Sequence, residues 1–152
     1  MSQVFKYVTS TSGVTSLADT GDWFQLRNGA SCIVEILEIR VFQHVETDIQ
    51  LNGIRLARGV GGAAGTGLTE YDYDVNNPAP VATAFSLPTT DVGTLDLEIR
   101  CGWNILQEFV WLPTPEIQII LHASDHLGIA PIVADAIAGV GCSITWQERR
   151  SA

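Results

Sequence analysis

The sequence predicts an all-β fold: a jelly-roll-like antiparallel sandwich of two sheets, with about eight strands and a long glycine-rich loop. Three observations support it. Apolar and polar residues alternate along several segments, which is the period of a strand with one buried face. No segment keeps the helical period over a useful length. Six prolines and fourteen glycines divide the apolar segments at the spacing of a sandwich or jelly roll.

The chain divides into a short arm and one domain. Residues 9–21 are rich in threonine, serine and glycine, a composition typical of an exposed arm or loop. We therefore expect residues 1–20 to form an N-terminal arm, able to add a strand to a neighbouring molecule. Residues 21–152 have the length of a single β-sandwich domain with a substantial core.

The first predicted strands follow the arm. Trp23–Leu26 is apolar and ends near Asn28, which with the next glycine supplies positive φ at a turn. Ser31–Phe42 is dominated by β-branched residues and predicts a strand of about ten residues. Its apolar face is expected to hold Leu37, Ile39 and Val41, with Glu38 and Arg40 on the other face.

Three later segments repeat the period of two. They are Leu95–Cys101, Ile117–His122 and Val140–Gln147. Ile129–Val140 comes closest to a helix, but a proline and a glycine limit it to a turn or two.

The composition indicates apolar surface that needs a cover. Charged residues make up 16% of the chain, against about 25% in ordinary soluble domains. No window of about 18 uncharged apolar residues is present, so no transmembrane helix is expected. The N-terminal residues also lack the apolar core of a signal peptide. A subunit contact is the usual place for such surface, which points to a component of an assembly.

Charge and cysteine content exclude several partners. The net charge is −9 with only eight lysines and arginines, so nucleic acid and anionic membrane surfaces are not expected as partners. Cys32, Cys101 and Cys142 cannot all pair and form no Cys-x-x-Cys motif. We interpret them as small buried hydrophobes of a protein folded in a reducing cytosol.

The run Gly59–Gly67 contains five glycines and no charge. Its start fits a loose dinucleotide-binding pattern, but that chemistry needs a helix directly after the loop to hold the anion. Leu68–Pro78 comes next instead, with three carboxylates and a proline, and no Walker A lysine is present. We therefore predict no nucleotide and no other cofactor, and a long connection between two β segments. Its glycines allow either mobility or close backbone contact with a neighbouring subunit.

Two acidic or histidine-containing patterns are candidate metal sites. Asp72-x-Asp74-x-Asn76 resembles the opening of a calcium loop, but the required glycine and glutamate positions hold asparagine and threonine. His122 and His126 have a zinc spacing that works only on a helix, whereas this segment is typical of the end of a strand. We assign no metal ligand and leave a weak site at either place open.

Enzyme chemistry has no signature in the chain. A Ser-His-Asp or Cys-His arrangement can be assembled in space without a sequence motif, but no Gly-x-Ser-x-Gly elbow is present. We expect no catalytic residues. The densest aromatic stretch, Gly102–Glu116, is a candidate interface because tryptophan buries a large area with few rotatable bonds. The alternative is that Trp103 and Trp111 cap the sandwich core, while Pro113 and Pro115 hold an extended connection.

The order of these segments carries a family resemblance. A long first strand is followed by Ile54–Gly59 and the glycine-rich run, and then by Leu87–Thr90, Gly102–Leu106 and Trp111–Glu116. This order resembles small virion-associated proteins encoded beside the head genes of tailed bacteriophages and prophages, over roughly residues 30–148. The Trp-Leu-Pro-Thr-Pro-Glu run is its strongest element. The family often has an arginine next, where this chain has Ile117.

The resemblance implies a structural role in a virion. The expected function is non-enzymatic capsid decoration, in which the protein binds the outside of the head and stabilises the shell. The expected partners are the major capsid protein and further copies of this chain, as a homotrimer, in a virion assembled in the host cytoplasm. A tail-fibre or host-recognition module that binds carbohydrate is the alternative, and a small β-sandwich hydrolase is the third. The residues expected at a subunit or capsid interface are Phe5, Tyr7, Gly59, Gly61, Gly62, Gly65, Gly67, Trp103, Trp111 and Pro113.

Overall fold

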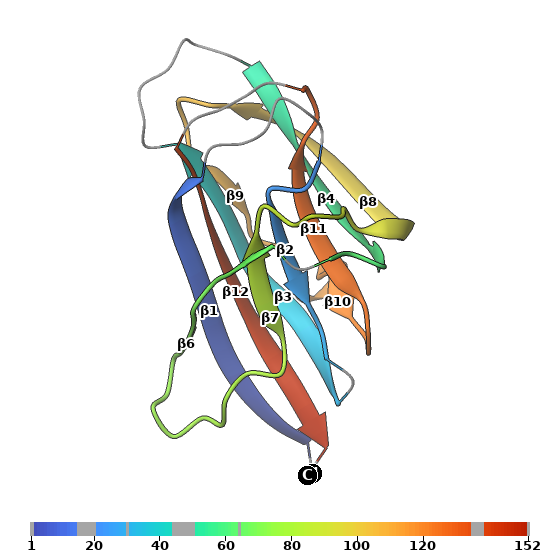
Figure 1. The fold of residues 1–152 in the computed structure, drawn as a ribbon. Helices are drawn as coiled ribbons and strands as arrows, with labels where there is room; N and C mark the ends of the chain where they lie inside the picture. Colours follow the sequence, from blue (N-terminus) through green and yellow to red (C-terminus); the bar gives the residue numbers. More distant parts are fainter. Residues whose placement is uncertain are drawn as a thin grey trace.

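The computed structural model is a sandwich of two antiparallel six-stranded sheets, as the alternating sequence pattern predicts (Figure 1). It describes residues 2–14, 21–29, 31–43, 51–63, 65–134 and 139–151. These ranges contain twelve strands rather than about eight, because several are only two to four residues long. The chain crosses repeatedly between the sheets, so each sheet pairs strands that lie far apart in the sequence.

The first sheet has the order β10-β3-β12-β1-β6, and β9 also pairs with β3. Three of its strands are long and form its centre, where they lie side by side as antiparallel neighbours (Figure 1). Its members are β1 (Ser2–Val14), β3 (Cys32–Gln43), β6 (Glu70–Asp72), β9 (Phe109–Trp111), β10 (Ile120–Leu121) and β12 (Val140–Ser151).

The second sheet has the order β5-β7-β2-β11-β4-β8. Its edges are the two-residue strand β5 and the much longer strand β8. Its members are β2 (Phe24–Arg27), β4 (Leu51–Val60), β5 (Thr66–Gly67), β7 (Thr83–Ser86), β8 (Gly93–Asn104) and β11 (His126–Pro131).

The expected N-terminal arm is wrong for its described part. Ser2–Val14 forms strand β1, which lies between β12 and β6 inside the first sheet. Its threonines and serines are compatible with this place because threonine is a good strand former. Residues 15–20 lie outside the described residues. The composition of the segment predicted an exposed arm. The segment is a strand because it pairs with β12, which lies at the other end of the sequence.

A β-bulge in β3 changes which side chains face the core. Thr145 pairs with Glu38 and Trp146 with Ile36, so Leu37 is an extra residue opposite the β12 strand. Ile36 and Ile39 are both fully buried, whereas Leu37 is only half-buried. The prediction that Leu37, Ile39 and Val41 share one buried face is therefore wrong at Leu37, since the bulge shifts the phase there.

One hydrophobic core fills the space between the sheets. Tyr7 packs on Trp146 with ring centroids 5.8 Å apart, and Trp23 meets Trp103 edge-on at 6.0 Å. Each fully buried large side chain contributes roughly 1.5–3 kcal/mol relative to an exposed one. Among the described residues, no helix is long and apolar enough to cross a membrane.

The segment after β9 differs from the expected extended connection. Pro115–Ile117 forms a short 3-10 helix, η1, with a proline in its first turn. The predicted strand Ile117–His122 is therefore reduced to the two residues of β10. Ile129–Val140 has no helix in its described part, where β11 ends at Pro131; residues 135–138 lie outside the described residues.

Candidate functional site

The glycine-rich run crosses the outer face of the second sheet. No helix follows it: the run ends in the short strand β5, and the next element is the short strand β6, as expected. A Cβ atom on Gly59 would collide with the carbonyl oxygen of Gly93, and one on Gly65 with the carbonyl oxygens of residues 86 and 87. These two glycines therefore allow close approach within the chain itself. Gly61 and Gly67 have open space around them, and whether they meet another subunit stays a prediction.

The calcium-like pattern forms a local turn. The side-chain Oδ1 of Asp74 accepts hydrogen bonds from the backbone N–H of Asn76 at 2.9 Å and from its side-chain amide at 3.1 Å. This is an ordinary Asx turn in an exposed loop. In the described part of the chain, no three histidine, cysteine, aspartate or glutamate side chains are placed to hold a metal ion.

His122 and His126 have different surroundings. His122 is exposed, and its backbone N–H donates to Oδ2 of Asp125 at 2.8 Å, which closes a tight turn. His126 is buried at the start of β11, and its Nδ1 accepts a hydrogen bond from the backbone N–H of Gly62 at 2.9 Å. Burial, followed by the nearby Arg27 guanidinium, lowers the pKa of His126. His126 thus stays neutral and anchors the glycine-rich run.

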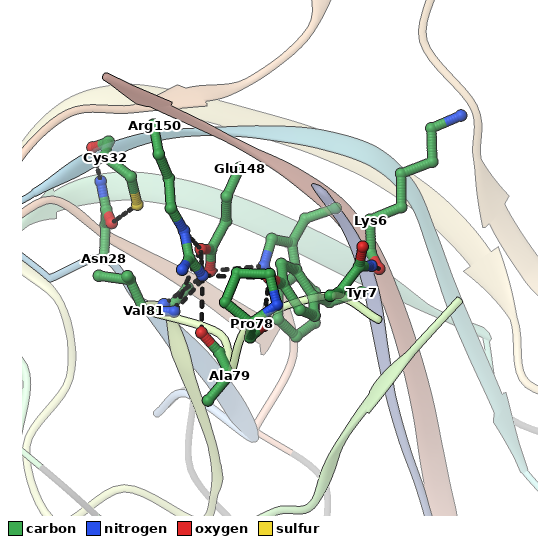
Figure 2. A network of polar contacts seen from close by, with 12 residues as sticks. Lys6, Tyr7, Asn28, Cys32, Pro78, Ala79, Val81, Glu148 and Arg150 are labelled. Carbon is green, nitrogen blue, oxygen red and sulfur yellow. Dashed lines mark hydrogen bonds and ion pairs between the residues drawn. The ribbon is translucent and has the colours of Figure 1, made fainter. Parts of the chain in front are cut away.

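A buried carboxylate lies at one end of the core (Figure 2). Glu148 has no exposed surface and stands on the core face of β12, in the same alternating row as Ile144 and Trp146. Its two oxygens accept from the backbone N–H of Val81 and Ala82 at 2.9 to 3.1 Å. The carboxylate therefore holds the segment that enters β7 against the first sheet.

Arg150 completes this cluster. Its Nε and one terminal nitrogen donate to the same oxygen of Glu148 at 3.0 and 2.5 Å, and its guanidinium lies 5.2 Å from the Phe5 ring centroid. The terminal nitrogen also donates to the hydroxyl of Tyr7 and to the carbonyl of Ala79. The guanidinium thus meets the buried Glu148 and Tyr7, the exposed Ala79 and a ring, and such additional partners are what a buried ion pair requires to be stable.

The hydroxyl of Tyr7 closes the same network. It donates to the carbonyl of Pro78 at 2.7 Å, and burial raises its pKa to about 12 despite the nearby Arg150 charge. The proton therefore stays on Tyr7 at physiological pH. Because each of these polar groups holds a neighbouring segment, the cluster acts as a clamp between the sheets.

A second buried carboxylate lies on the outer face of the second sheet. The Asp22 side chain has no exposed surface and accepts from Gln25 at 2.9 Å, from the backbone N–H of Val92 at 2.8 Å and from Arg55 at 3.2 Å. Two buried atoms beside it, Oε1 of Gln25 and Nε of Arg55, have no hydrogen-bond partner among the residues that the structure describes. Burial raises the pKa of Asp22. This cluster fixes the 91–92 segment over the sheet.

The aromatic stretch contains exposed aliphatic side chains, and one of its two tryptophans is buried. Trp103 is buried and donates from Nε1 to the carbonyl of Gln107, while Trp111 and Pro113 are half-buried. Trp103 therefore caps the core and is not an accessible contact residue, which corrects its place among the interface residues. The exposed apolar side chains of this stretch are instead Leu106, Val110 and Leu112, and Ile117 directly after it is exposed as well. We call these four residues the aliphatic patch.

The other residues expected at an interface also include both buried and partly exposed side chains. Tyr7 is fully buried and so is also wrong as a surface contact, whereas Phe5 is half-buried beneath Arg150. Two tyrosines that the sequence did not single out, Tyr71 and Tyr73, are 58% and 62% exposed at the β6 edge of the first sheet. The cysteines follow the expectation in part, since Cys32 and Cys142 are buried and Cys101 is half-buried, all with free thiols.

Only one of the two buried carboxylates, Glu148, could have been predicted from the sequence. Along β12 the apolar phase runs through Ile144 and Trp146 and then meets Glu148 and Arg150, so an acidic and a basic residue fall on the core face. Continuing the alternation to the end of the chain would have found them. Asp22 gives no such signal, because the segment that covers it, near Val92, is seventy residues away.

No protein-family model matches this chain, and a search of curated proteins finds no relative. Its function therefore has to be inferred from the geometry of the described residues and from the order of its sequence segments.

Proposed function

We propose that this chain is a non-enzymatic structural protein of a tailed-phage virion, and that it decorates the outer surface of the capsid. Its partners in this proposal are the major capsid protein and further copies of itself, arranged as a homotrimer. The proposal takes the virion and the capsid from the resemblance carried by Trp111–Glu116 and the segments before it. The exposed apolar side chains of the aliphatic patch support the proposal as a means of contact with the capsid.

The aliphatic patch is the observation that carries the proposal. Leu106, Leu112 and Ile117 are each 60% exposed or more, within a stretch of twelve residues. Their backbone is held by neighbours that are fixed: Trp103 is buried and Trp111 packs against the core. An exposed apolar surface on a rigid support is typical of a site for protein contact, because little conformational entropy is lost on binding.

The two buried carboxylate clusters fit a role that demands resistance to unfolding. Glu148 and Asp22 each tie a connecting segment to a sheet through backbone N–H groups. A decoration protein binds in many copies at once, so modest contacts of each copy add up over the shell. A chain whose loops are fixed in advance loses less entropy at each contact.

A second candidate function has an observation of its own. Tyr71 and Tyr73 lie on the same phase of the β6 segment and are both more than half exposed, and the exposed Asp72 and Asp74 alternate with them in the sequence. Aromatic faces with nearby hydrogen-bonding groups suit a sugar ring. This arrangement favours the carbohydrate-binding tail module over a hydrolase as the alternative.

Electron microscopy of purified virions labelled with an antibody to this chain separates the two functions. Decoration predicts label over the whole head and far more copies per particle than any tail component. Particles without the protein should then lose their DNA at lower temperature and adsorb normally. Label confined to the tail, with reduced adsorption, would replace the proposal by the carbohydrate-binding alternative.

A matched pair of variants tests the patch. Leu112→Ser removes a 69% exposed side chain from the aliphatic patch and should abolish or strongly weaken binding to undecorated heads. Val75→Ser removes a 95% exposed side chain elsewhere and should bind as the unmodified protein does. Both should keep the same melting temperature, since neither side chain is in the core. Equal binding of the two variants would remove the patch from the proposal.

A further inference from the structure

Strand β8 leaves a long edge of the second sheet without a partner. It spans twelve residues and pairs with β4 alone, and no strand lies on its other side in the part of the chain that the structure describes. Figure 1 shows it at the outer margin of the sheet. Such an edge presents a row of backbone N–H and C=O groups that another strand can pair with.

The common protections of an edge strand are weak here. The pairing with β4 is regular from Asn104 back to Leu97, and its single irregularity lies near Gly93, at the beginning of β8. The strand contains no proline and no lysine. Its charges are of both signs, Asp96, Glu98 and Arg100, and so do not simply repel a second strand.

The order of these charges makes β8 complementary to itself. In an antiparallel pair, residues directly opposite each other point to the same face. If two copies pair about a two-fold axis at Ile99, Glu98 of each copy lies opposite Arg100 of the other, and Leu97 lies opposite Cys101. Centring the pair on Glu98 or on Arg100 opposes two like charges, and centring it on Leu97 opposes Asp96 with Glu98. Centring on Glu98 also opposes Asp96 with Arg100, so of these four registers the Ile99 register alone opposes unlike charges without opposing like charges.

The neighbouring strand adds a reason for a second carboxylate at this place. Arg100 lies directly opposite Arg55 of β4, and the two guanidinium groups line one open pocket. Like charges directly opposite each other are destabilising. Arg55 contacts Asp22, and Arg100 contacts only Glu98 of its own strand among the ion pairs of the described residues. Glu98 from a second copy would place another negative charge beside Arg100.

We propose that β8 is a self-association edge, through which two copies of this chain pair antiparallel about a two-fold axis at Ile99. The two second sheets then form one continuous sheet across the contact. The contact is isologous, so it produces pairs of chains, or pairs of trimers if a separate three-fold contact is also present. It does not rest on the virion role, and it applies equally to a protein that acts outside a capsid.

Molar mass and charge reversal test the contact. Light scattering of the full chain should give an even number of copies that dissociates on dilution. Glu98→Arg turns both unlike pairs into like pairs and should raise the dissociation constant roughly tenfold or more. The double change Glu98→Arg with Arg100→Glu exchanges the charges and should restore association. Glu116→Arg makes the same charge change on an exposed side chain outside β8 and should have no effect.

A cross-link tests the register. Leu97→Cys places a thiol opposite Cys101 of the second copy, where Cα atoms about 4.5–5.5 Å apart permit a disulfide. Within one strand these residues are about 13 Å apart and cannot bridge. Mild oxidation should yield a covalent dimer, and Leu97→Cys combined with Cys101→Ser should yield none. A monomer at all concentrations, an odd number of copies, no effect of Glu98→Arg, or no cross-link would each overturn the proposal.

Discussion

Glu148 and Asp22 are two buried carboxylates that hold loops in similar ways but with unequal completeness. Each accepts backbone N–H groups of a distant segment and contacts one arginine. Arg150 gives Glu148 two nitrogens and also donates to neighbouring acceptors. Arg55 donates one nitrogen to Asp22 at 3.2 Å, and its buried Nε has no partner within the described part of the chain.

The difference teaches what stabilises a charge inside a sandwich. Proximity of an arginine is insufficient, because removing a carboxylate from water costs several kcal/mol that only a full set of donors offsets. Asp22 is consistent with this, since burial, together with the nearby Asp91 carboxylate, raises its pKa although Val92, Gln25 and Arg55 all favour its charged form. Glu148 sits between the sheets and Asp22 outside one of them, so the better-satisfied group is the one at the core.

The largest expected effect is at Glu148. Glu148→Gln removes the charge that pairs with Arg150, replaces one of the two acceptor oxygens by a donor, and leaves a largely buried guanidinium without its ion pair. We expect the free energy of unfolding to fall by about 3–5 kcal/mol, measured by urea denaturation at neutral pH. Glu116→Gln, on an exposed side chain, should leave it unchanged. A loss no larger than that of the control would show that the clamp does not stabilise the fold.

A smaller effect is expected at Asp22. Asp22→Asn retains one acceptor oxygen for Val92 and removes a charge whose burial is unfavourable. We expect a loss of about 1–2 kcal/mol by the same denaturation measurement. If Asp22→Asn proved as costly as Glu148→Gln, completeness of the donor set would not explain the difference between the two sites.

The pH dependence of the same variant sharpens this point. Because the pKa of Asp22 is raised in the folded state, the folded protein binds this proton more tightly than the unfolded chain does. The contribution of Asp22 to stability therefore grows as pH falls from the raised pKa toward the ordinary value of 3.8. The stability gap between the unmodified protein and Asp22→Asn should widen over that window. A gap that narrows there would contradict the direction of the shift.

The smallest effect is expected at His126, beneath the same loops as Asp22. Its pKa is lowered, so the folded state resists protonation, and stability should fall as pH drops below the ordinary value of 6.5. His126→Asn keeps an acceptor for Gly62 without a titrating group and should remove that slope. Hydrogen exchange of the Gly62 amide should accelerate at acid pH in the unmodified protein alone. Equal acceleration in both would assign the effect to another group.

The fold class was predictable because alternation depends on local sequence. Leu95–Cys101 and Val140–Gln147 fall within strands as predicted, and the absence of a helix after Gly67 follows from the residues that come next. Properties that depend on distant partners were missed. The strand at Ser2–Val14 exists because it pairs with β12, and the bulge at Leu37 is visible only from the register of that same strand.

The candidate surface was predictable as a region and not as residues. The tryptophans made Gly102–Glu116 a candidate surface, but Trp103 is buried while Leu106 and Leu112 are exposed. The position of a short loop can be predicted from the sequence, but the path of its backbone cannot. The sequence therefore does not decide which side chains of the loop point outward. The buried environment of Asp22 likewise depends on a loop from elsewhere in the chain.

The pairing of β1 with β12 has a consequence for how the chain folds. Ser2 pairs with Ser151 and the register continues inward to Val14 opposite Val140, so the first described strand meets its main partner only at the end of the sequence. Contacts at such separation slow folding because the loop must close before any pairing stabilises it. During synthesis β1 therefore leaves the ribosome long before its partner exists. The centre of the first sheet should be the last part to become protected, after the second sheet has formed.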